Sequence, residues 1–149
     1  KGEGPDDDYT VPIGVADLKR EGVDITVVAI AWMVHEALAA AEIMDKEGVS
    51  VEVIDPRTLA PLDAGTILKS AQKTGRLLVA DEAGPTAGAS AEIIALATED
   101  AETFRALKVP VRRVCALNAP IPYSPVLEDH VFPNRKRIAD GIRTVMSAG

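Results

Sequence analysis

The sequence has few of the residues that build disulfides and transition-metal sites. Its 149 residues include one cysteine and two histidines. A single cysteine cannot form an intrachain disulfide, and so small a supply of histidine and cysteine argues against a transition-metal site. The pair His35-Glu36 begins like the metal-binding helix of a zinc protease, but Ala39 stands where the second histidine would be needed. We therefore predict no metal-binding residue, and we expect Cys115, which lies in an apolar run, to be a buried, unreactive thiol rather than a reactive one.

Aromatic residues and long apolar runs are also scarce, and acidic residues outnumber basic ones. Aromatic residues make up 3% of the chain against 47% for all apolar residues, so aliphatic side chains must fill the core. No apolar run approaches the roughly 20 residues of a membrane span, and Lys1 to Asp8 lack the apolar region of a signal peptide. The formal net charge of −7 argues against nucleic acid or an anionic membrane as a partner and favours a basic one. Because the chain has no initiator Met, we expect an excised domain or a cleaved fragment.

Strand and helix patterns alternate along most of the chain. Apolar, largely β-branched runs predict strands at residues 24–31, 51–54, 76–80 and 111–115. Helical patterns predict helices at 34–46, 63–73, 89–99, 101–107 and 134–146. This alternation is typical of an α/β fold with a mostly parallel sheet, helices on both sides and right-handed crossovers. The length suits one domain, which we place at 23–149 after an irregular lead-in segment at 1–22.

Two residues are expected to mark the ends of the helix at 63–73. Asp63 can accept hydrogen bonds from the free N–H groups of the first turn. Gly75 stands where a left-handed cap would end the helix.

Matches to catalytic motifs fail on their spacing. Ser70-x-x-Lys73 and Lys73-Thr74-Gly75 match motifs of the penicillin-interacting enzymes, in which they lie far apart on different elements. Here the two motifs overlap at one helix end, so we treat the match as chance. We predict no catalytic residue in this chain.

Two proline-rich loops that follow strands carry most of the chain's unusual chemistry. They span residues 55–63 and 120–129. In an open α/β sheet, ligands usually bind beyond the carboxyl ends of the strands. Arg57 in the first loop can form a local ion pair that ties the loop down, or a bidentate contact to a carboxylate of a ligand or another domain. Tyr123 and Ser124 lie between prolines, which lower the entropy cost of presenting an exposed loop, so we expect them at an interface.

A glycine-containing loop between a strand and a helix is another candidate site. Gly84, Gly88 and Ser90 lie around the start of the helix at 89–99, where free backbone N–H groups can hold an anion. The loop matches neither G-x-G-x-x-G nor a Walker loop. A tight turn packed against a neighbouring domain is the other interpretation, and the sequence leaves both open.

Six segments together are similar to one family. They are Asp8–Gly14, Gly22–Ala29, Met33–Leu38, Val53–Asp63, Glu82–Glu92 and Pro120–Asp129. Val53–Asp63 resembles the family's Asp-Leu-Arg-Thr-Leu-x-Pro-x-Asp segment, with Pro56 in place of the common Leu. Pro120–Asp129 matches Pro-x-Pro-Tyr-Ser-Pro-x-Leu-Glu-Asp. Over nearly its whole length the chain resembles the C-terminal domain of the beta subunit of thiamine-diphosphate-dependent 2-oxoacid dehydrogenases, within the transketolase C-terminal superfamily.

The resemblance implies a three-layer α/β/α domain with a five-stranded, mostly parallel sheet in which one strand is antiparallel. In the intact enzyme, the E1 alpha subunit and a second beta subunit complete an α2β2 heterotetramer that decarboxylates a 2-oxoacid, or cleaves acetoin, and reductively acylates a lipoyl group. Thiamine diphosphate and magnesium lie between the alpha subunit and another domain of the beta subunit, whose motifs this sequence lacks. We therefore expect no cofactor-binding residue and no activity of the isolated domain. The location implied is the cytoplasm, or the mitochondrial matrix in a eukaryote.

Assembly and docking are the roles that the resemblance leaves to this domain. The candidate interface residues are Arg57, Tyr123, Ser124 and Glu128. The family also docks a small, basic subunit-binding domain of the acyltransferase core, here through the segment before the last strand, the final helix and the chain end. Lys108 departs from that pattern, because related beta subunits often place an acidic residue there. The alternative function is a free-standing module that binds a small anion through the Gly84–Ser90 loop and Arg57.

Overall fold

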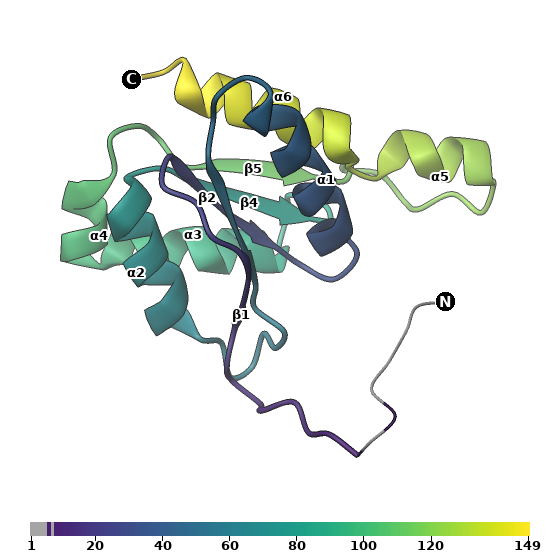
Figure 1. Ribbon diagram of the computed structural model, residues 1–149. Helices are drawn as coiled ribbons and strands as arrows, with labels where there is room; N and C mark the ends of the chain where they lie inside the picture. The colour runs from purple at the N-terminus through teal and green to yellow at the C-terminus, as the bar shows by residue number, and fades with distance from the viewer. Residues whose placement is uncertain (1–5, 7) are drawn as a thin grey trace.

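The computed structural model describes residue 6 and residues 8–149, which form three layers with a sheet in the middle (Figure 1). The strands are β1 (Asp17–Arg20), β2 (Ile25–Ala29), β3 (Val51–Asp55), β4 (Leu77–Asp81) and β5 (Arg112–Cys115). They lie in the order β1-β3-β2-β4-β5, with β1 antiparallel to β3 and every other pair parallel. For the described part of the chain, this confirms the expected five-stranded, mostly parallel sheet with one antiparallel strand.

Helices cover both faces of this sheet (Figure 1). They are α1 (Met33–Asp45), α2 (Ala64–Thr74), α3 (Ala89–Glu99), α4 (Ala101–Ala106), α5 (Pro125–Val131) and α6 (Arg135–Met146). Helices α1 and α6 contribute to one apolar cluster, and α2 and α3 contribute to a second cluster on the opposite face. The two clusters alternate along the strands, since Val27 belongs to the first and Val28 to the second.

The central strands are buried because both faces of the sheet are covered. All five residues of β2 are buried, and most of them are β-branched, which suits a pleated surface packed on both sides. Aliphatic and small residues fill both clusters, as the low aromatic content predicts.

Helix α6 lies very close to the sheet at Gly141. A Cβ atom at this position would lie 2.7 Å from Cγ2 of Val114 and 3.0 Å from Cδ1 of Leu78. Glycine is unfavourable inside a helix, but here its missing side chain allows α6 to approach β4 and β5.

Strand β1 corrects the expectation that residues 1–22 are irregular. Residues 17–20 pair with β3, so the sheet begins N-terminal to the boundary placed at residue 23. The segment Asp-Leu-Lys-Arg has no apolar run, because this strand lies at the sheet edge and is only partly covered. Charged residues are common on short edge strands, and hydrogen bonds to β3, rather than local propensity, hold this one in place.

Helix α5 corrects the expectation that residues 120–129 form a loop throughout. Pro125 occupies the first turn of α5, where its missing N–H costs nothing. Of the seven residues of α5 only Val131 is buried. The helix therefore lacks the apolar periodicity by which a core-facing helix is recognised, and Glu128 lies on a helix rather than a loop.

The expected ends of α2 are confirmed. The side chain of Asp63 accepts a hydrogen bond from the backbone N–H of Thr66 at 3.1 Å, and Gly75 has φ of 71° in the left-handed region. The other expected strands and helices agree with the structure to within about two residues at either end. Among the described residues, no helix has the length and apolar character to cross a membrane.

Candidate functional site

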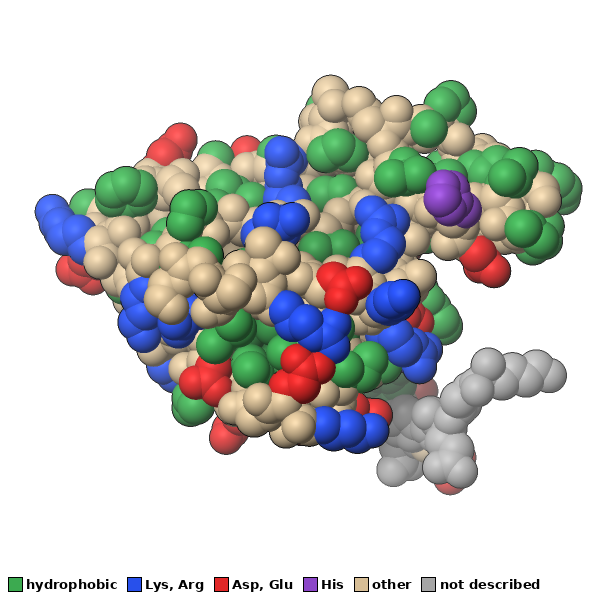
Figure 2. All heavy atoms as spheres, turned by 90° about the horizontal axis from the view of Figure 1, so that it is seen from above, with side chains coloured by type: hydrophobic (Ala, Val, Ile, Leu, Met, Phe, Trp, Pro, Cys, Tyr) green, Lys and Arg blue, Asp and Glu red, His purple; other side chains and the backbone are tan. Residues whose placement is uncertain are grey.

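The carboxyl end of the sheet leads into a projecting arm with exposed apolar side chains. This arm, residues 117–131, follows β5 and ends in α5, which extends away from the body of the molecule (Figure 1). Tyr123 is fully exposed, and Ile121, Val126 and Leu127 are 62%, 79% and 56% exposed. Hydrophobic side chains gather at this end in the space-filling view as well (Figure 2). Exposed apolar patches of this kind mark surfaces that can bury area against another protein.

Three of the four predicted interface residues lie on this arm. Tyr123 and Ser124 directly precede α5, and the carbonyl of Ser124 accepts hydrogen bonds from the N–H groups of Leu127 at 3.0 Å and Glu128 at 2.8 Å. These bonds fix the start of the helix and leave the Tyr123 side chain in solvent. The fourth residue, Arg57, follows β3, which β2 and β4 separate from β5, so the four do not form one cluster.

Arg57 forms an ion pair that ties its loop down, but the partner lies on β1 rather than beside Arg57 in the sequence. Its guanidinium donates to Asp17 at 2.8 Å, and its backbone N–H donates to the Asp55 carboxylate at 2.8 Å. The hydrogen bond and charge of Lys19, together with Arg57, hold the pKa of Asp17 below its ordinary value. These contacts join the loop after β3 to β1 and hold Arg57 at φ of 57°. Asp17 was missed because β1 itself was not expected.

The glycine loop already contains a carboxylate at the start of α3. Asp81, only 2% exposed at the end of β4, accepts from the N–H groups of Ala83 at 2.9 Å and Ser90 at 3.1 Å. A Cβ atom on Gly88 would lie 2.6 Å from the carbonyl oxygen of Gly84, so the turn is too tight for a side chain there. A bound anion would meet the negative charge of Asp81. This geometry favours the tight turn over anion binding.

An acidic hollow lies beside the arm, between α1 and α5. It has a volume of about 680 Å³, and Glu82, Glu128 and Asp129 are among the residues that line it. At its side the Glu36 carboxylate binds Arg135 through the backbone N–H, Nε and Nη2, at 2.6, 3.2 and 3.1 Å. Burial raises the pKa of Glu36, but the hydrogen bonds and charge of Arg135 outweigh it and hold this pKa below its ordinary value.

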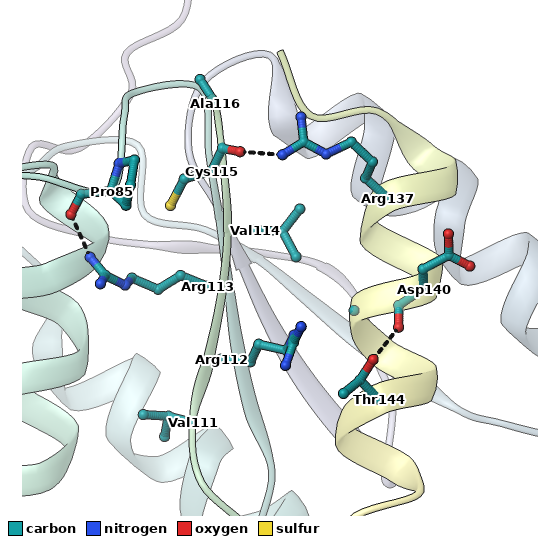
Figure 3. Close-up of a pocket in the computed structure, with 11 residues that line it drawn as sticks. Pro85, Val111, Arg112, Arg113, Val114, Cys115, Ala116, Arg137, Asp140 and Thr144 are labelled. Carbon is teal, nitrogen blue, oxygen red and sulfur yellow. Dashed lines mark hydrogen bonds between the residues drawn. The ribbon is translucent and has the colours of Figure 1, made fainter. Parts of the chain in front are cut away.

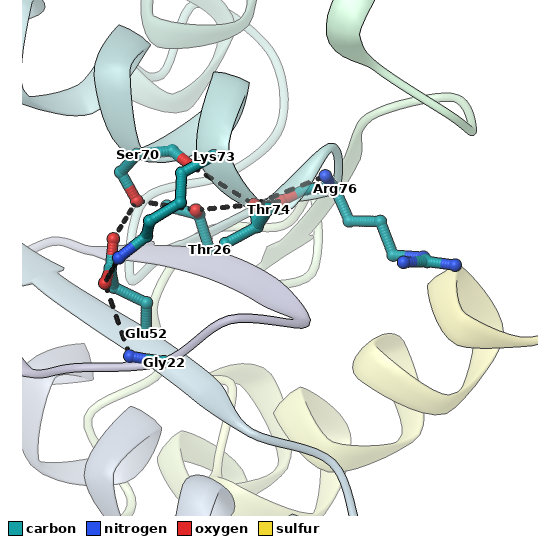
Figure 4. A network of polar contacts seen from close by, with 7 residues as sticks. All are labelled: Gly22, Thr26, Glu52, Ser70, Lys73, Thr74 and Arg76. Atoms are coloured by element: carbon teal, nitrogen blue, oxygen red, sulfur yellow. Dashed lines mark hydrogen bonds and ion pairs between the residues drawn. The ribbon is translucent and has the colours of Figure 1, made fainter.

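A third buried acid, Glu52, explains the apparent catalytic motif on α2 (Figure 4). Glu52 is 2% exposed on β3 and accepts hydrogen bonds from Ser70 and Lys73. The Ser70 hydroxyl also lies 2.6 Å from the hydroxyl of Thr26 on β2. Lys73 therefore binds a carboxylate rather than activating Ser70, and the Ser-x-x-Lys spacing attaches α2 to the sheet.

Cys115 is buried as expected, with its sulfur 3.5 Å from the hydroxyl of Ser90. Among the described residues, no group of three or more His, Cys, Asp and Glu side chains is arranged to hold a metal ion.

These observations define an α/β/α domain whose most distinctive surface is an exposed arm after its last strand. Residues 14–138 match the family model described as the transketolase C-terminal domain. The chain belongs to this family.

Curated relatives are beta subunits of dehydrogenases and oxidoreductases. The chain is 42% identical over 149 residues to the acetoin:2,6-dichlorophenolindophenol oxidoreductase subunit beta of Cupriavidus necator, covering all of this chain and 44% of that protein. It is 41% identical to the pyruvate dehydrogenase E1 component subunit beta of Bacillus subtilis, covering 97% of this chain and 43% of that protein. It is 40% identical to the 2-oxoisovalerate dehydrogenase subunit beta of the same organism, covering 96% of this chain and 43% of that protein. The chain therefore spans less than half the length of these relatives.

A solved structure has the same fold. It is described as a split gene transketolase, an inactive beta4 tetramer, and it aligns with a TM-score of 0.80 at 23% identity, covering 95% of this chain and 44% of that chain.

Proposed function

We propose that this chain is the C-terminal assembly domain of the E1 beta subunit of a 2-oxoacid or acetoin dehydrogenase. The observation that carries the proposal is the 42% identity that extends over all 149 residues to a subunit of this kind. Relatives named for pyruvate, 2-oxoisovalerate and acetoin are similarly identical to the chain. We therefore propose the class of enzyme and leave the choice among these three substrates open.

The described residues do not fit thiamine diphosphate. A diphosphate held by magnesium needs free N–H or positively charged donors and free oxygen ligands. At the start of α3, where the sequence suggested an anion loop, the Asp81 carboxylate already accepts from the N–H groups of Ala83 and Ser90. The described residues also hold no candidate metal cluster. In this proposal the cofactor of the intact enzyme binds to other domains, and this chain performs no catalytic step.

The arm at residues 117–131 would bury its apolar side chains against the E1 alpha subunit or a second beta subunit of an α2β2 assembly. Its exposed aromatic and aliphatic side chains support this role, because burying them would supply the hydrophobic driving force for association. Tyr123 is well suited to anchor such a contact, since tyrosines are enriched among the residues that dominate interface energies.

A chimaeric subunit tests the proposal. The C-terminal part of the Cupriavidus necator beta subunit would be replaced by this chain and co-expressed with the alpha subunit, and the assembly size would be measured by light scattering. We expect a complex of both subunits that Val126→Asp disrupts. Val23→Asp, which changes a valine that is 65% exposed away from the arm, should leave the complex intact. A chimaera that folds but never binds the alpha subunit would refute the proposed function.

We also propose that the domain docks the subunit-binding domain of an acyltransferase core. The segment before β5 lines an apolar groove of about 540 Å³ with Phe104, Leu107, Val109, Pro110 and Val111. The exposed arginines of β5 would repel a basic partner, so we place the docking on this groove rather than on the strand. Binding should fall when Phe104, which is 62% exposed, is replaced by Glu, and no change in affinity would exclude the groove.

A further inference from the structure

A groove between β5 and α6 lies along the open edge of the sheet (Figure 3). It has a volume of about 550 Å³. β5 is the last strand of the sheet and pairs only with β4 among the described strands. Its other side presents backbone N–H and C=O groups that a further strand could pair with, except the carbonyl of Cys115, which already accepts a hydrogen bond from Arg137.

The groove has an excess of positive charge. Arg112, Arg113 and Arg137 line it, and Asp140 is the acidic residue among its lining residues. Asp140 is already paired with Arg143 at 2.6 Å. Within the described part of the chain, none of the three lining arginines forms a salt bridge.

Two of these arginines are held in place by neutral acceptors. Arg137 donates to the carbonyl of Cys115 at 2.6 Å, and Arg113 donates to the carbonyl of Pro85 at 2.7 Å. Backbone carbonyls orient the guanidinium groups without neutralising their charge. Figure 3 shows Arg112 directed toward α6 and Arg113 directed toward Pro85, on opposite faces of the strand.

A second copy of this chain is a poor occupant of the edge. Pairing β5 with its own copy would bring the arginines of one strand near those of the other, and like charges on paired strands are unfavourable. A complementary negative charge is needed, although the chain as a whole has a formal charge of −7.

We propose that the open edge of β5 binds an extended, acidic segment of a partner protein by strand addition. The segment's backbone pairs with β5, and two consecutive acidic residues, which point to opposite faces of a strand, meet Arg112 and Arg113. Charge-assisted contacts to guanidinium groups then select carboxylates over other side chains. This proposal does not rest on the proposed function, because it uses the β5 edge and not the arm.

A peptide titration tests this proposal. The probe is a fluorescein-labelled heptapeptide, Thr-Glu-Glu-Val-Glu-Glu-Thr, and its binding to the 149-residue chain is followed by fluorescence anisotropy at low and physiological salt. We expect saturable binding that weakens with salt, and Arg112→Glu should lower the affinity at least about tenfold because it replaces attraction by repulsion. Arg105→Glu is the matched control: it makes the same charge change on an exposed residue of α4 that does not line the groove.

Two further probes separate strand addition from general charge attraction. A peptide N-methylated at alternate residues keeps its charge but loses the backbone donors, so it should bind at least about tenfold more weakly. A lysine version of the peptide should not bind. Circular dichroism would establish that Arg112→Glu and Arg113→Glu are folded. Any of three results would overturn the proposal. They are an equal loss of peptide affinity in Arg105→Glu, full binding of the N-methylated peptide, and displacement of the peptide by inorganic phosphate alone.

Discussion

Glu36 and Arg135 form a bidentate ion pair that joins two helices far apart in the sequence. Glu36 lies in the first turn of α1, and Arg135 is the first residue of α6. The carboxylate accepts from Nε at 3.2 Å and Nη2 at 3.1 Å, and from the backbone N–H of the same arginine at 2.6 Å. One acid therefore pairs with the guanidinium and also satisfies a free N–H group at the start of α6.

Replacing Glu36 by Gln should lower the free energy of unfolding by about 1–3 kcal/mol at neutral pH, because hydrogen bonds to a charged, buried acceptor are weakened. The pKa of Glu36 is depressed below 4.5 in the folded chain, so its contribution is complete above about pH 4.5 and is lost as pH falls through the folded value. Urea unfolding of the unmodified chain and of Glu36→Gln should show a difference in unfolding free energy at pH 7 that disappears in acid. If this difference in unfolding free energy is unchanged at pH 3, the charge of Glu36 is not its source.

Replacing Asp63 by Ala should cost about 1–2 kcal/mol, since the residue caps α2 and also accepts from the N–H of Ala16 at 3.0 Å. The hydrogen bonds from Ala16 and Thr66 lower the pKa of Asp63, so this stability is fully present above about pH 3.8 and is lost as pH falls through the lower folded value. Asp63→Asn, which keeps one acceptor, is the control and should retain part of the effect. If thermal or urea unfolding shows a loss of only a few tenths of a kcal/mol in unfolding free energy, the cap contributes little.

Replacing Gly141 by Ala should destabilise the chain by about 1–3 kcal/mol, because the new methyl group would overlap Val114 and Leu78. Gly65→Ala on α2 is a matched control, since its new Cβ would have only the Asp63 carboxylate nearby, at 3.7 Å. That change should stabilise by about 0.4–1 kcal/mol through the unfolded state. Equal effects of the two substitutions on the melting temperature would contradict the close packing of α6 on the sheet.

Calorimetric titration of the chain with thiamine diphosphate and magnesium should give no heat of binding. The physical reason is that the Asp81 carboxylate already accepts from the N–H of Ser90 at the start of α3, so this donor is not free for a diphosphate. Asp81→Asn tests this reason, because it removes the carboxylate charge at the start of α3 while retaining a hydrogen-bond acceptor. Micromolar affinity of the unmodified chain would require a cofactor site that is not apparent among the described residues.

The sequence by itself determined the features that depend on neighbouring residues. The β-branched run of β2 predicts a strand buried on both faces, because adjacent side chains of a strand point to opposite sides. Asp63 and Gly75 predict the ends of α2, since capping needs only a side chain or a φ angle within one turn of the helix. The proline motif around Tyr123 likewise supports the family resemblance without reference to any three-dimensional contact.

Tertiary structure alone decided the features that join distant segments. Strand β1 has no apolar pattern and exists through its pairing with β3. The hydrogen-bond partner of Arg57, Asp17, lies 40 positions away in the sequence. The partner of Arg135, Glu36, lies 99 positions away. Helix α5 has so few buried residues that no periodicity marks it. Such contacts depend on how the sheet orders its strands, and hydrophobic periodicity records only which face of an element is buried, not which charged group will lie opposite it.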